Sequence, residues 1–446
     1  MSKEIDSAKY ICQLLQDNGF DAVFVGGCVR DTICGKQCND IDIATSAKSS
    51  DVMTVMLKNG IKSKIVGEAF SVCIARHESY EFEIASFRKD IGGDGRHPTS
   101  IEFASMEEDS KRRDFTINAV FYDPIKKEYY DFVGGIKDIT DRKLRFVGDP
   151  KERLKEDYLR ALRFIRFWAK GFTPDDKTVE IVNDLSPNIS YFVARDRISK
   201  EIMEKLFYSI DEVSFVFSIM SKRLPKLLET LFPEVYATIG VPQNPKYHPE
   251  GDVFTHTMRI VQHLAFLGSN KEIILAGLYH DVGKAVTTIE TNGGDITSRG
   301  HEKASVDLAM KYMEKNRFPN KTIDYVCGLI GDHMKLHYKG MKVSTLRKLI
   351  AKPYFDDLII HAYADCMASD GDISILEEYS ETIREIKNRD GIVLPAPLIT
   401  GKTLIDIGFK PSPIFKEALE EAYNLQLEGV FSSLEEGIEI VKRRLK

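Results

Sequence analysis

Hydrophobic and polar positions follow two different rhythms along this chain, and the change comes near residue 150. Before it, short stretches of alternating polar and apolar residues, typical of strands, stand between stretches with helical spacing. Beyond it the strand patterns fade, and apolar residues recur at helical spacing to the C-terminus. The pattern predicts an α+β region, with one sheet and helices packed against it, followed by an all-helical remainder.

The first region contains several recognisable elements. An apolar stripe from Ile5 to Leu15 ends at Gly19, a residue that commonly follows a helix. A second helix is predicted over residues 49–58, where Asn59 and Gly60 end it. Strands are predicted over residues 21–25, 40–44, 71–76 and 81–87, of which the last two form a hairpin.

Length and composition limit the protein classes. The chain has 446 residues, enough for about three domains, and its 43% hydrophobic and 29% charged residues exclude dominant disorder. The net charge of −6 excludes a generally basic nucleic-acid coat but not a local basic face. No apolar run reaches the roughly 18 residues of a membrane span, and no apolar signal core stands at the start. Seven cysteines without paired CxxC units indicate free thiols, and we expect a cytoplasmic protein.

A glycine pair, an arginine and two aspartates lie within twenty residues near the N-terminus. Gly26 and Gly27 follow a predicted strand, where glycine lets the backbone approach a phosphate, and Arg30 can bind the same triphosphate. Asp40 and Asp42 are two apart on a predicted strand, so both carboxylates point to one face. Such a pair can hold two Mg²⁺ ions that activate a hydroxyl and neutralise pyrophosphate. The set predicts a nucleotidyltransferase centre; the alternative is a structural turn.

Other polar residues can complete this centre. Glu83, on a later predicted strand, is either a third carboxylate or a solvated edge residue. Candidates for binding phosphate and ribose are Arg112, Arg113, Asp114 and Asn118. The alternative for this stretch is a charged helix start capped by Asp109 or Ser110.

A basic segment follows these motifs. Between Arg142 and Lys170 lie ten basic and four acidic residues, which suggests a polyanionic partner or, alternatively, a helix face laced with salt bridges. Its arginines at positions 160, 163 and 166 recur every three residues after Asp157.

The chain resembles the bacterial class II tRNA nucleotidyltransferases, or CCA-adding enzymes, of the family shared with bacterial poly(A) polymerase. The resemblance is carried by the segments GGCVRD, NDIDIAT, EIASFRKD, EDSKRRDFTINAVFYDP, DFVGGIKD and EDYLRALRFIRF, over roughly the first half of the chain. It implies a polymerase-β-like α+β head that adds C, C and A to the tRNA 3′ end from CTP and ATP.

The resemblance also implies residue roles. These are Asp40 and Asp42 for Mg²⁺, Gly27 and Arg30 for the triphosphate, Arg113, Asp114 and Asn118 for the nucleotide, and Asp157, Arg160, Arg163 and Arg166 for the base. The Gly-rich stretch with Asp94 and Arg96 resembles the flexible loop of the full CCA-adding and A-adding enzymes. Residues 195–197 with Glu201 resemble the neck helix motif, although a surface salt-bridge cluster explains them equally well.

The template role of Asp157 and Arg160 has a physical basis. A carboxylate accepts from the amino group of C or A, while a guanidinium donates to the ring acceptor beside it. U and G offer a carbonyl oxygen instead, and buried polar sites reject two facing acceptors. One Asp–Arg pair can therefore admit CTP and ATP and exclude UTP and GTP.

Histidines and aspartates on predicted helices form a second constellation. The set comprises His256, His280, Asp281 and Asp365 as candidate metal ligands, and Lys284, His301 and His333 as accessory residues. Imidazole with carboxylate suits Mn, Fe, Ni, Co or Zn, and the additional histidines can bind a second ion or phosphate. The set resembles the HD phosphohydrolases, which implies hydrolysis of phosphoesters on RNA ends; the alternative is a degenerate domain kept as a helical body for tRNA.

Four regions follow from these features, and the Pro-containing stretch 242–249 is the clearest linker. They are a catalytic head over 1–140, a helical neck and body for base recognition and RNA binding over 141–240, an HD domain over 241–375 and a tRNA-binding tail over 376–446. The rival functions are an A-adding enzyme or poly(A) polymerase of the same family, and an HD phosphohydrolase whose head only holds RNA.

Overall fold

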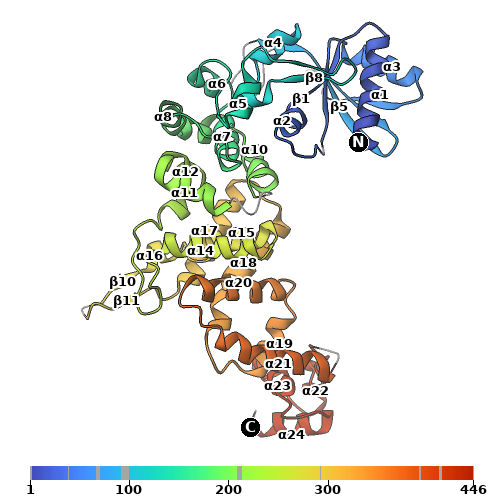
Figure 1. The fold of residues 1–446 in the computed structure, drawn as a ribbon. Helices are drawn as coiled ribbons and strands as arrows, with labels where there is room; N and C mark the ends of the chain where they lie inside the picture. The colour runs from blue at the N-terminus through green and yellow to red at the C-terminus, as the bar shows by residue number, and fades with distance from the viewer. Residues whose placement is uncertain are drawn as a thin grey trace. The chain divides into compact units, whose positions relative to one another are not determined.

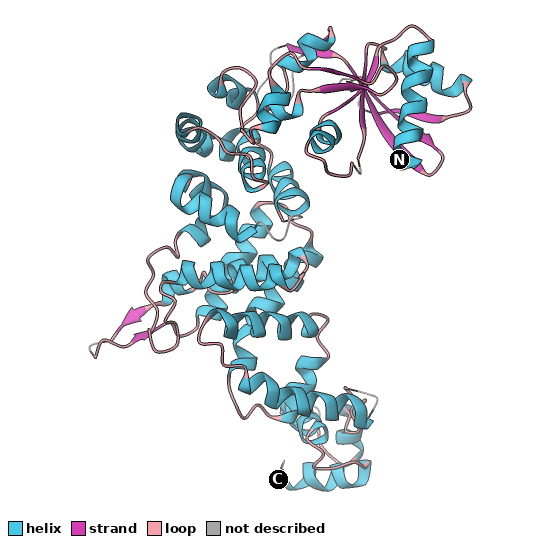
Figure 2. Cartoon of the chain, in the orientation of Figure 1, coloured by secondary structure: helices cyan, strands magenta, loops and turns pink. Residues whose placement is uncertain are grey.

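A computed structural model describes residues 3–38, 40–66, 71–91, 100–207, 213–291, 293–390, 393–410 and 414–444 (Figure 1). The chain divides into two compact units, Met1–Pro233 and Glu234–Lys446. Strands and helices are mixed in the first part of the first unit, and helices make up most of the remainder (Figure 2). The α+β head and the helical remainder are confirmed, whereas the finer division into four regions stays a prediction.

A seven-stranded sheet, in the order β3-β4-β5-β2-β1-β8-β9, forms the centre of the head. Its strands are β1 Ala22–Val25, β2 Asp42–Thr45, β3 Lys62–Val66, β4 Val72–His77, β5 Tyr80–Ser86, β8 Phe121–Asp123 and β9 Glu128–Tyr130. Only β2 and β5 run parallel; all other neighbours in this sheet are antiparallel. The predicted β4–β5 hairpin is confirmed, but the strand expected from Asp40 begins at Asp42.

Helices of the head pack onto this sheet and near its edges. The helices α1 Lys3–Asp17 and α3 Ser49–Lys58 contact each other and the sheet (Figure 1), and α1 buries Ile11 and Leu15 completely. The helix over 49–58 has its predicted bounds. The other elements up to the neck are α2 Gly27–Ile33, α4 Met106–Lys111, α5 Gly135–Thr140, a 3-10 helix Thr116–Asn118, and the two-stranded sheet of β6 Arg88–Ile91 and β7 Ser100–Phe103. Asp94 and Arg96 lie outside the described residues.

An aromatic cluster attaches the helix α7, Arg160–Ala169, to the head motifs. Phe164 and Phe167 of α7 are buried, with ring centroids 5.8 Å from Phe146 and 5.4 Å from Phe115, respectively. This packing holds the arginine-rich helix beside the segment that follows Asp114. The remaining elements of this unit are α6 Pro150–Glu156, α8 Asp176–Leu185, a 3-10 helix Ser186–Asn188, α9 Ile189–Phe192, α10 Arg195–Lys200, a π-helix Glu201–Leu206, α11 Val213–Arg223 and α12 Pro225–Leu231, with α13 Pro233–Tyr236 at the boundary.

The second unit is almost entirely helical. Its helices are α14 Val253–Phe266, α15 Lys271–Tyr279, α16 Lys284–Thr287, α17 His301–Lys315, α18 Asn320–Asp332, a 3-10 helix His333–His337, α19 Val343–Ile350, α20 Phe355–Ala368, α21 Ser374–Asp390, α22 Gly401–Asp406, α23 Ile414–Leu427 and α24 Leu434–Arg444. A short antiparallel ribbon, β10 Ile289–Glu290 with β11 Ile296–Thr297, corrects the all-helical prediction. Among the described helices, none combines the length and apolar character that crossing a membrane requires.

Candidate functional site

Three exposed carboxylates gather where β2 begins in the head. β2 and β5 are parallel with Ile43 opposite Ile84, so Asp42 and Glu83 occupy matching positions one residue earlier. Although solvent reaches Asp42, the surrounding protein and the charges of Asp40 and Glu83 raise its pKa to about 6. A cation would relieve this repulsion, and an all-oxygen donor set is what Mg²⁺ prefers. The residues therefore fit the predicted Mg²⁺ centre.

The glycine pair leaves the space beside these carboxylates open. Gly26 has a φ of +78°, and a Cβ atom at this position would lie 3.5 Å from Asp42 Oδ2. A side chain here would be strained and would face the carboxylate. The chain thus passes close to Asp42 immediately before α2, as a triphosphate held by the same metal would require.

Arg30 is buried and already has protein partners. Its Nη1 donates to Asn118 Oδ1 over 2.7 Å, and its Nη2 lies 2.8 Å from Asp31 Oδ1. Asn118 in turn donates to Asp114 over 3.2 Å, and Arg163 Nη2 lies 2.8 Å from the other Asp114 oxygen. Four of the predicted nucleotide-binding residues thus form one continuous chain and hold one another in place.

Arg113 shares a buried carboxylate with Arg112. Asp109 lies 2.9 Å from Arg113 and 2.7 Å from Arg112, and these charges lower the pKa of Asp109 against the opposing effect of burial. The guanidinium of Arg113 also lies 5.1 Å from the ring centre of Phe121. The helix start is capped by Ser105 in a capping box, not by Asp109 or Ser110. Asp109 instead orients the two arginines.

The side chains of the two predicted template residues are not paired with each other, although the Arg160 backbone NH donates to the Asp157 carbonyl over 3.0 Å. Asp157 lies between α6 and α7, and its Oδ2 is 2.8 Å from Arg197 Nη2. Arg160 lies 2.7 Å from Glu156 and donates to the Arg153 carbonyl over 2.6 Å. Arg166 pairs with Glu201 over 2.8 Å. The basic segment is thus laced with salt bridges, as its alternative interpretation holds, and its contacts reach the neck motif.

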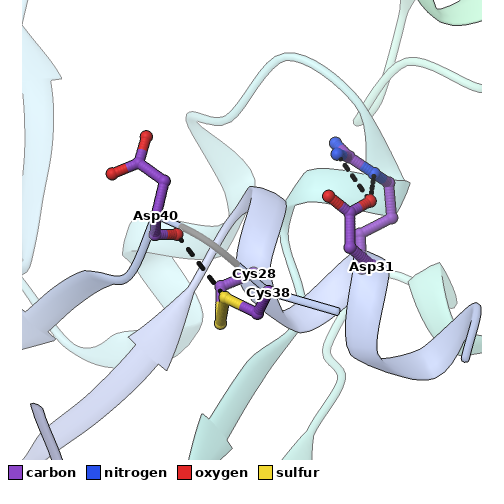
Figure 3. Close-up of a disulfide and its surroundings, with 5 residues drawn as sticks. Cys28, Asp31, Cys38 and Asp40 are labelled. Atoms are coloured by element: carbon purple, nitrogen blue, oxygen red, sulfur yellow. Dashed lines mark hydrogen bonds and ion pairs between the residues drawn. A yellow bond between two sulfur atoms is a disulfide. The ribbon is translucent and has the colours of Figure 1, made fainter. Parts of the chain in front are cut away.

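A disulfide joins Cys28, within the predicted triphosphate motif, to Cys38, just before the metal motif (Figure 3). Cys28 and Cys38 bond with their Cα atoms 5.0 Å apart, within the usual range for disulfides. The expectation of free thiols is therefore wrong for this pair, because the turn after α2 brings together two cysteines ten residues apart. Cys38 also contacts the backbone oxygen of Asp40, whose carboxylate points away from the disulfide.

In the second unit, the predicted histidines and aspartates converge from several helices. His256 lies on α14, His280 and Asp281 directly follow α15, and Asp365 lies on α20. Asp365 Oδ1 is 3.1 Å from His256 Nε2, and Asp281 Oδ2 is 3.1 Å from His280 Nε2. These four ligand candidates are all buried.

His301 and His333 extend the cluster on the other side of Asp281. His301 begins α17 and His333 directly follows α18, and their Nε2 atoms lie 3.3 Å apart. His301 Nε2 is also 3.1 Å from Asp281 Oδ1. The start of α17 can come this close because Gly283 has no side chain. A Cβ atom at Gly283 would lie only 2.2 Å from the His301 carbonyl oxygen. Lys284 completes the set, with its Nζ 2.7 Å from Asp281 Oδ2.

Three of the histidines are oriented by backbone carbonyls. The Nδ1 atoms of His280, His301 and His333 lie 2.7–2.8 Å from carbonyl oxygens three residues earlier. An Nδ1 that donates leaves Nε2 as the ligand atom, the usual arrangement of metal-bound imidazoles. The inward Nε2 atoms of His256 and His280 are buried without hydrogen-bond geometry, and the mixed nitrogen and oxygen donors suit a transition metal. The cluster therefore fits a metal centre.

The buried carboxylates of this cluster are neutralised by neighbouring positive charges. Burial would raise the pKa of Asp281, but the charges of His280 and Lys284 hold it well below its usual range. Burial likewise opposes the charged form of His256, yet the neighbouring carboxylates of Asp365 and Glu250 raise its pKa to about 9. In the metal-free protein, protons on imidazoles balance the buried carboxylates.

The sequence interpretation missed several residues of this cluster. They are Gln243, His248, Glu250, His337 and His361. His337 lies 3.2 Å from Asp365, and His361 is buried with its ring centre 5.2 Å from that of His280. Seven of the ten histidines in the chain thus gather here, so their concentration in the second unit was the available signal.

Comparisons with known proteins cover both centres. The model of the Poly A polymerase head domain matches residues 22–145, and the HD domain model matches residues 253–365. The multifunctional CCA protein of Shewanella denitrificans is 32% identical over 340 residues, covering 74% of this chain and 78% of that protein. The multifunctional CCA protein of Pasteurella multocida is 32% identical over 341 residues, covering 73% and 77%.

Solved structures share the fold over the whole chain. The Bacillus stearothermophilus CCA-adding enzyme in complex with CTP has a TM-score of 0.71 at 23% identity and covers 100% of this chain and 98% of that one. The Thermotoga maritima CCA-adding enzyme complexed with tRNA has a TM-score of 0.60 at 17% identity, covering 100% and 97%.

Proposed function

This chain belongs to the family of multifunctional CCA proteins, and from that premise we propose that it adds C, C and A to the 3′ end of tRNA from CTP and ATP, and that its HD domain hydrolyses phosphoesters on RNA ends. The observation that carries the first activity is the carboxylate edge at Asp42, open beside Gly26.

Nucleotidyl transfer requires a hydroxyl nucleophile, a held triphosphate and a stabilised pyrophosphate. Asp40 and Asp42 would hold two Mg²⁺ ions, with Glu83 as the third carboxylate at the same edge. When bound, Mg²⁺ lowers the pKa of the tRNA 3′-hydroxyl and neutralises the leaving pyrophosphate. Gly27 and Arg30 would face the triphosphate, and Arg113, oriented by Asp109, would contact its phosphates.

Base selection would use Asp157 and Arg160. The Asp157 side chain is held in place by Arg197 and by the backbone NH of Leu159, which donates over 3.1 Å. A carboxylate so held remains an acceptor for the amino group of C or A. Arg160 would offer a donor to the neighbouring ring nitrogen, and a base would have to compete with Glu156 for it.

The HD cluster would hold one or two divalent ions. One set of ligands would be His256, His280, Asp281 and Asp365; a second would share Asp281 with His301 and His333. When bound, such ions supply Lewis acidity for phosphoester hydrolysis. Lys284, held beside Asp281, would face the phosphate charge.

Three tRNA transcripts test the first activity. They end at the discriminator base, at C and at CC, and each is incubated with Mg²⁺ and CTP, ATP or both before gel separation. We expect the shortest transcript to gain three nucleotides with both NTPs and then stop. Addition of one A to the CC transcript alone would identify an A-adding enzyme, a long ladder with ATP a poly(A) polymerase, and no extension would overturn the proposal.

A transcript ending in a 2′,3′-cyclic phosphate tests the second activity. Wild-type protein that has been stripped of metal with a chelator and reloaded with Mn²⁺, Ni²⁺ or Co²⁺ should open the cyclic phosphate. The Asp281→Asn variant treated in the same way should not. Absence of hydrolysis with every metal would overturn the hydrolytic role and leave nucleotide addition unaffected.

A further inference from the structure

The segment that precedes α14 forms part of the wall of the HD metal cluster. Residues 242–249, with their three prolines, resemble a linker in sequence, but Gln243 and His248 of this stretch, and Glu250 directly after it, turn their side chains toward the metal ligands. Gln243 is buried and accepts from Lys284 Nζ over 2.8 Å. The Glu250 side chain is 0% exposed and that of His248 is 21% exposed. Such burial of polar groups in a loop indicates a specific role.

Glu250 makes the contact that matters most for the metal. Its Oε1 lies 2.6 Å from His256 Nδ1 and 3.0 Å from His248 Nδ1. Because Nδ1 donates to the carboxylate, the opposite nitrogen of His256 becomes the ligand atom. That Nε2 faces Asp365 Oδ1 at 3.1 Å and Asp281 Oδ2 at 3.9 Å.

Helix geometry explains why the Nδ1 atom of His256 needs an acceptor from outside its helix, whereas those of His280 and His333 do not. His280 and His333 follow helix C-termini, where the last carbonyls lack helical partners and can accept from Nδ1. His256 lies in the first turns of α14, where unpaired backbone groups are N–H donors and carbonyls are engaged along the helix. An acceptor for its Nδ1 must therefore come from outside α14, and Glu250 supplies it.

We propose that Glu250 is a positioning residue of the HD centre, holding His256 with Nε2 turned to the metal, while Gln243 positions Lys284 in the same way. This inference rests on the proposed metal-dependent hydrolysis. It makes the stretch ahead of α14 part of the catalytic unit rather than a spacer. His248 Nδ1 contacts the same Glu250 oxygen, and the His248 side chain is partly exposed whereas that of Glu250 is buried.

Metal affinity is the decisive measurement. The full-length protein is stripped of metal with a chelator and titrated with Mn²⁺. Every protein compared carries the background substitution Asp42→Ala, so that the head carboxylates contribute less to the measured Mn²⁺ binding. Glu250→Ala should weaken Mn²⁺ binding about 10–100-fold, the usual cost of losing a carboxylate partner of a metal-bound histidine. Glu250→Gln should weaken Mn²⁺ binding less than Glu250→Ala does, because the Gln amide oxygen can still accept from His256 Nδ1. His256→Ala serves as the positive control.

Glu302→Gln is the matched control. Glu302 lies 3.7 Å from His301 Nδ1, but that nitrogen already meets the Ser298 carbonyl, so this change should leave affinity within about twofold. The visible spectrum of the Co²⁺-loaded protein gives a second readout, since reorientation of His256 changes the ligand field. Melting of the metal-free variants separates a lost fold from a misplaced ligand.

Three results would overturn the assignment. Equal Mn²⁺ affinity in wild type, Glu250→Ala and Glu302→Gln would show that Glu250 does not position His256. Loss of one full metal equivalent with unchanged affinity for the rest would show that Glu250 is itself a ligand. No Mn²⁺ at the cluster of the wild type would remove the proposed hydrolytic centre itself, an outcome distinct from the other two.

Discussion

The two centres of this protein bring carboxylates together in opposite electrostatic surroundings. In the head, Asp40, Asp42 and Glu83 are exposed, and their mutual repulsion contributes to a pKa of about 6 for Asp42. In the second unit, Asp281 and Asp365 are buried among imidazoles that hold their pKa values well below the usual range. The head carboxylates repel one another, so a cation would stabilise them, whereas the buried carboxylates are already neutralised by neighbouring side chains.

From this difference we infer how each centre would use a metal. A carboxylate edge that repels itself gains most from ions that arrive with the nucleotide triphosphate and leave with pyrophosphate. A buried cluster with every ligand oriented by a second group suits an ion that stays bound through many turnovers. The head centre should therefore depend on free Mg²⁺, and the HD centre on prior loading.

The largest expected effect comes from removing one carboxylate at each centre. Asp42→Asn should lower nucleotide incorporation by about a thousandfold or more, about 4 kcal/mol of transition-state stabilisation, and spare hydrolysis. Asp281→Asn should do the reverse. Both activities are measured on the same preparations, so each variant controls for the folding of the other. Loss of both activities in either variant would break the separation of the two centres.

Removing the disulfide should have the next largest effect. By loop entropy, closing the loop between Cys28 and Cys38, which are ten positions apart, stabilises the head by about 2.7 kcal/mol. Cys28→Ser should lower the urea midpoint of the head, and reductant should do the same to the wild type only. The control Cys34→Ser changes a free thiol on the same segment. A wild-type midpoint insensitive to reductant would contradict the prediction.

Replacing Arg197 should have a smaller effect, on base selection. Without Arg197, the Asp157 carboxylate loses its ion pair and becomes free to turn. Arg197→Ala should reduce the preference for CTP over UTP about tenfold, near 1.4 kcal/mol. The control Arg195→Ala removes a neighbouring side chain that donates to the Ser190 carbonyl. If both variants keep wild-type selectivity, the Asp157–Arg197 contact is purely structural.

Local spacing in the sequence explains which parts of these centres could be predicted. Asp40 and Asp42 are two residues apart, and His280 and Asp281 are adjacent. Short sequence motifs therefore identify both pairs. The contacts of Asp157 with Arg197, 40 residues beyond it, and of His256 with Asp365 on another helix depend on tertiary packing. Composition and periodicity carry no signal for such a contact. The sheet and the helix over 49–58 could be predicted because their patterns are local.

The smallest expected effect is a difference in proton release between the centres. His256, with a pKa of about 9 in the metal-free protein, must lose its Nε2 proton to bind a metal, so loading the HD centre at pH 7.5 should release about one proton. Asp42, with a pKa of about 6, is already ionised at that pH, and Mg²⁺ binding in the head should release almost none. Raising the pH from 7.0 to 7.5 should therefore tighten HD metal binding about threefold and leave head binding unchanged, until protonation of Asp42 weakens it below about pH 6. Calorimetry in buffers of different ionisation enthalpy measures both quantities, and equal proton release at the two centres would show that their carboxylates are not neutralised in different ways.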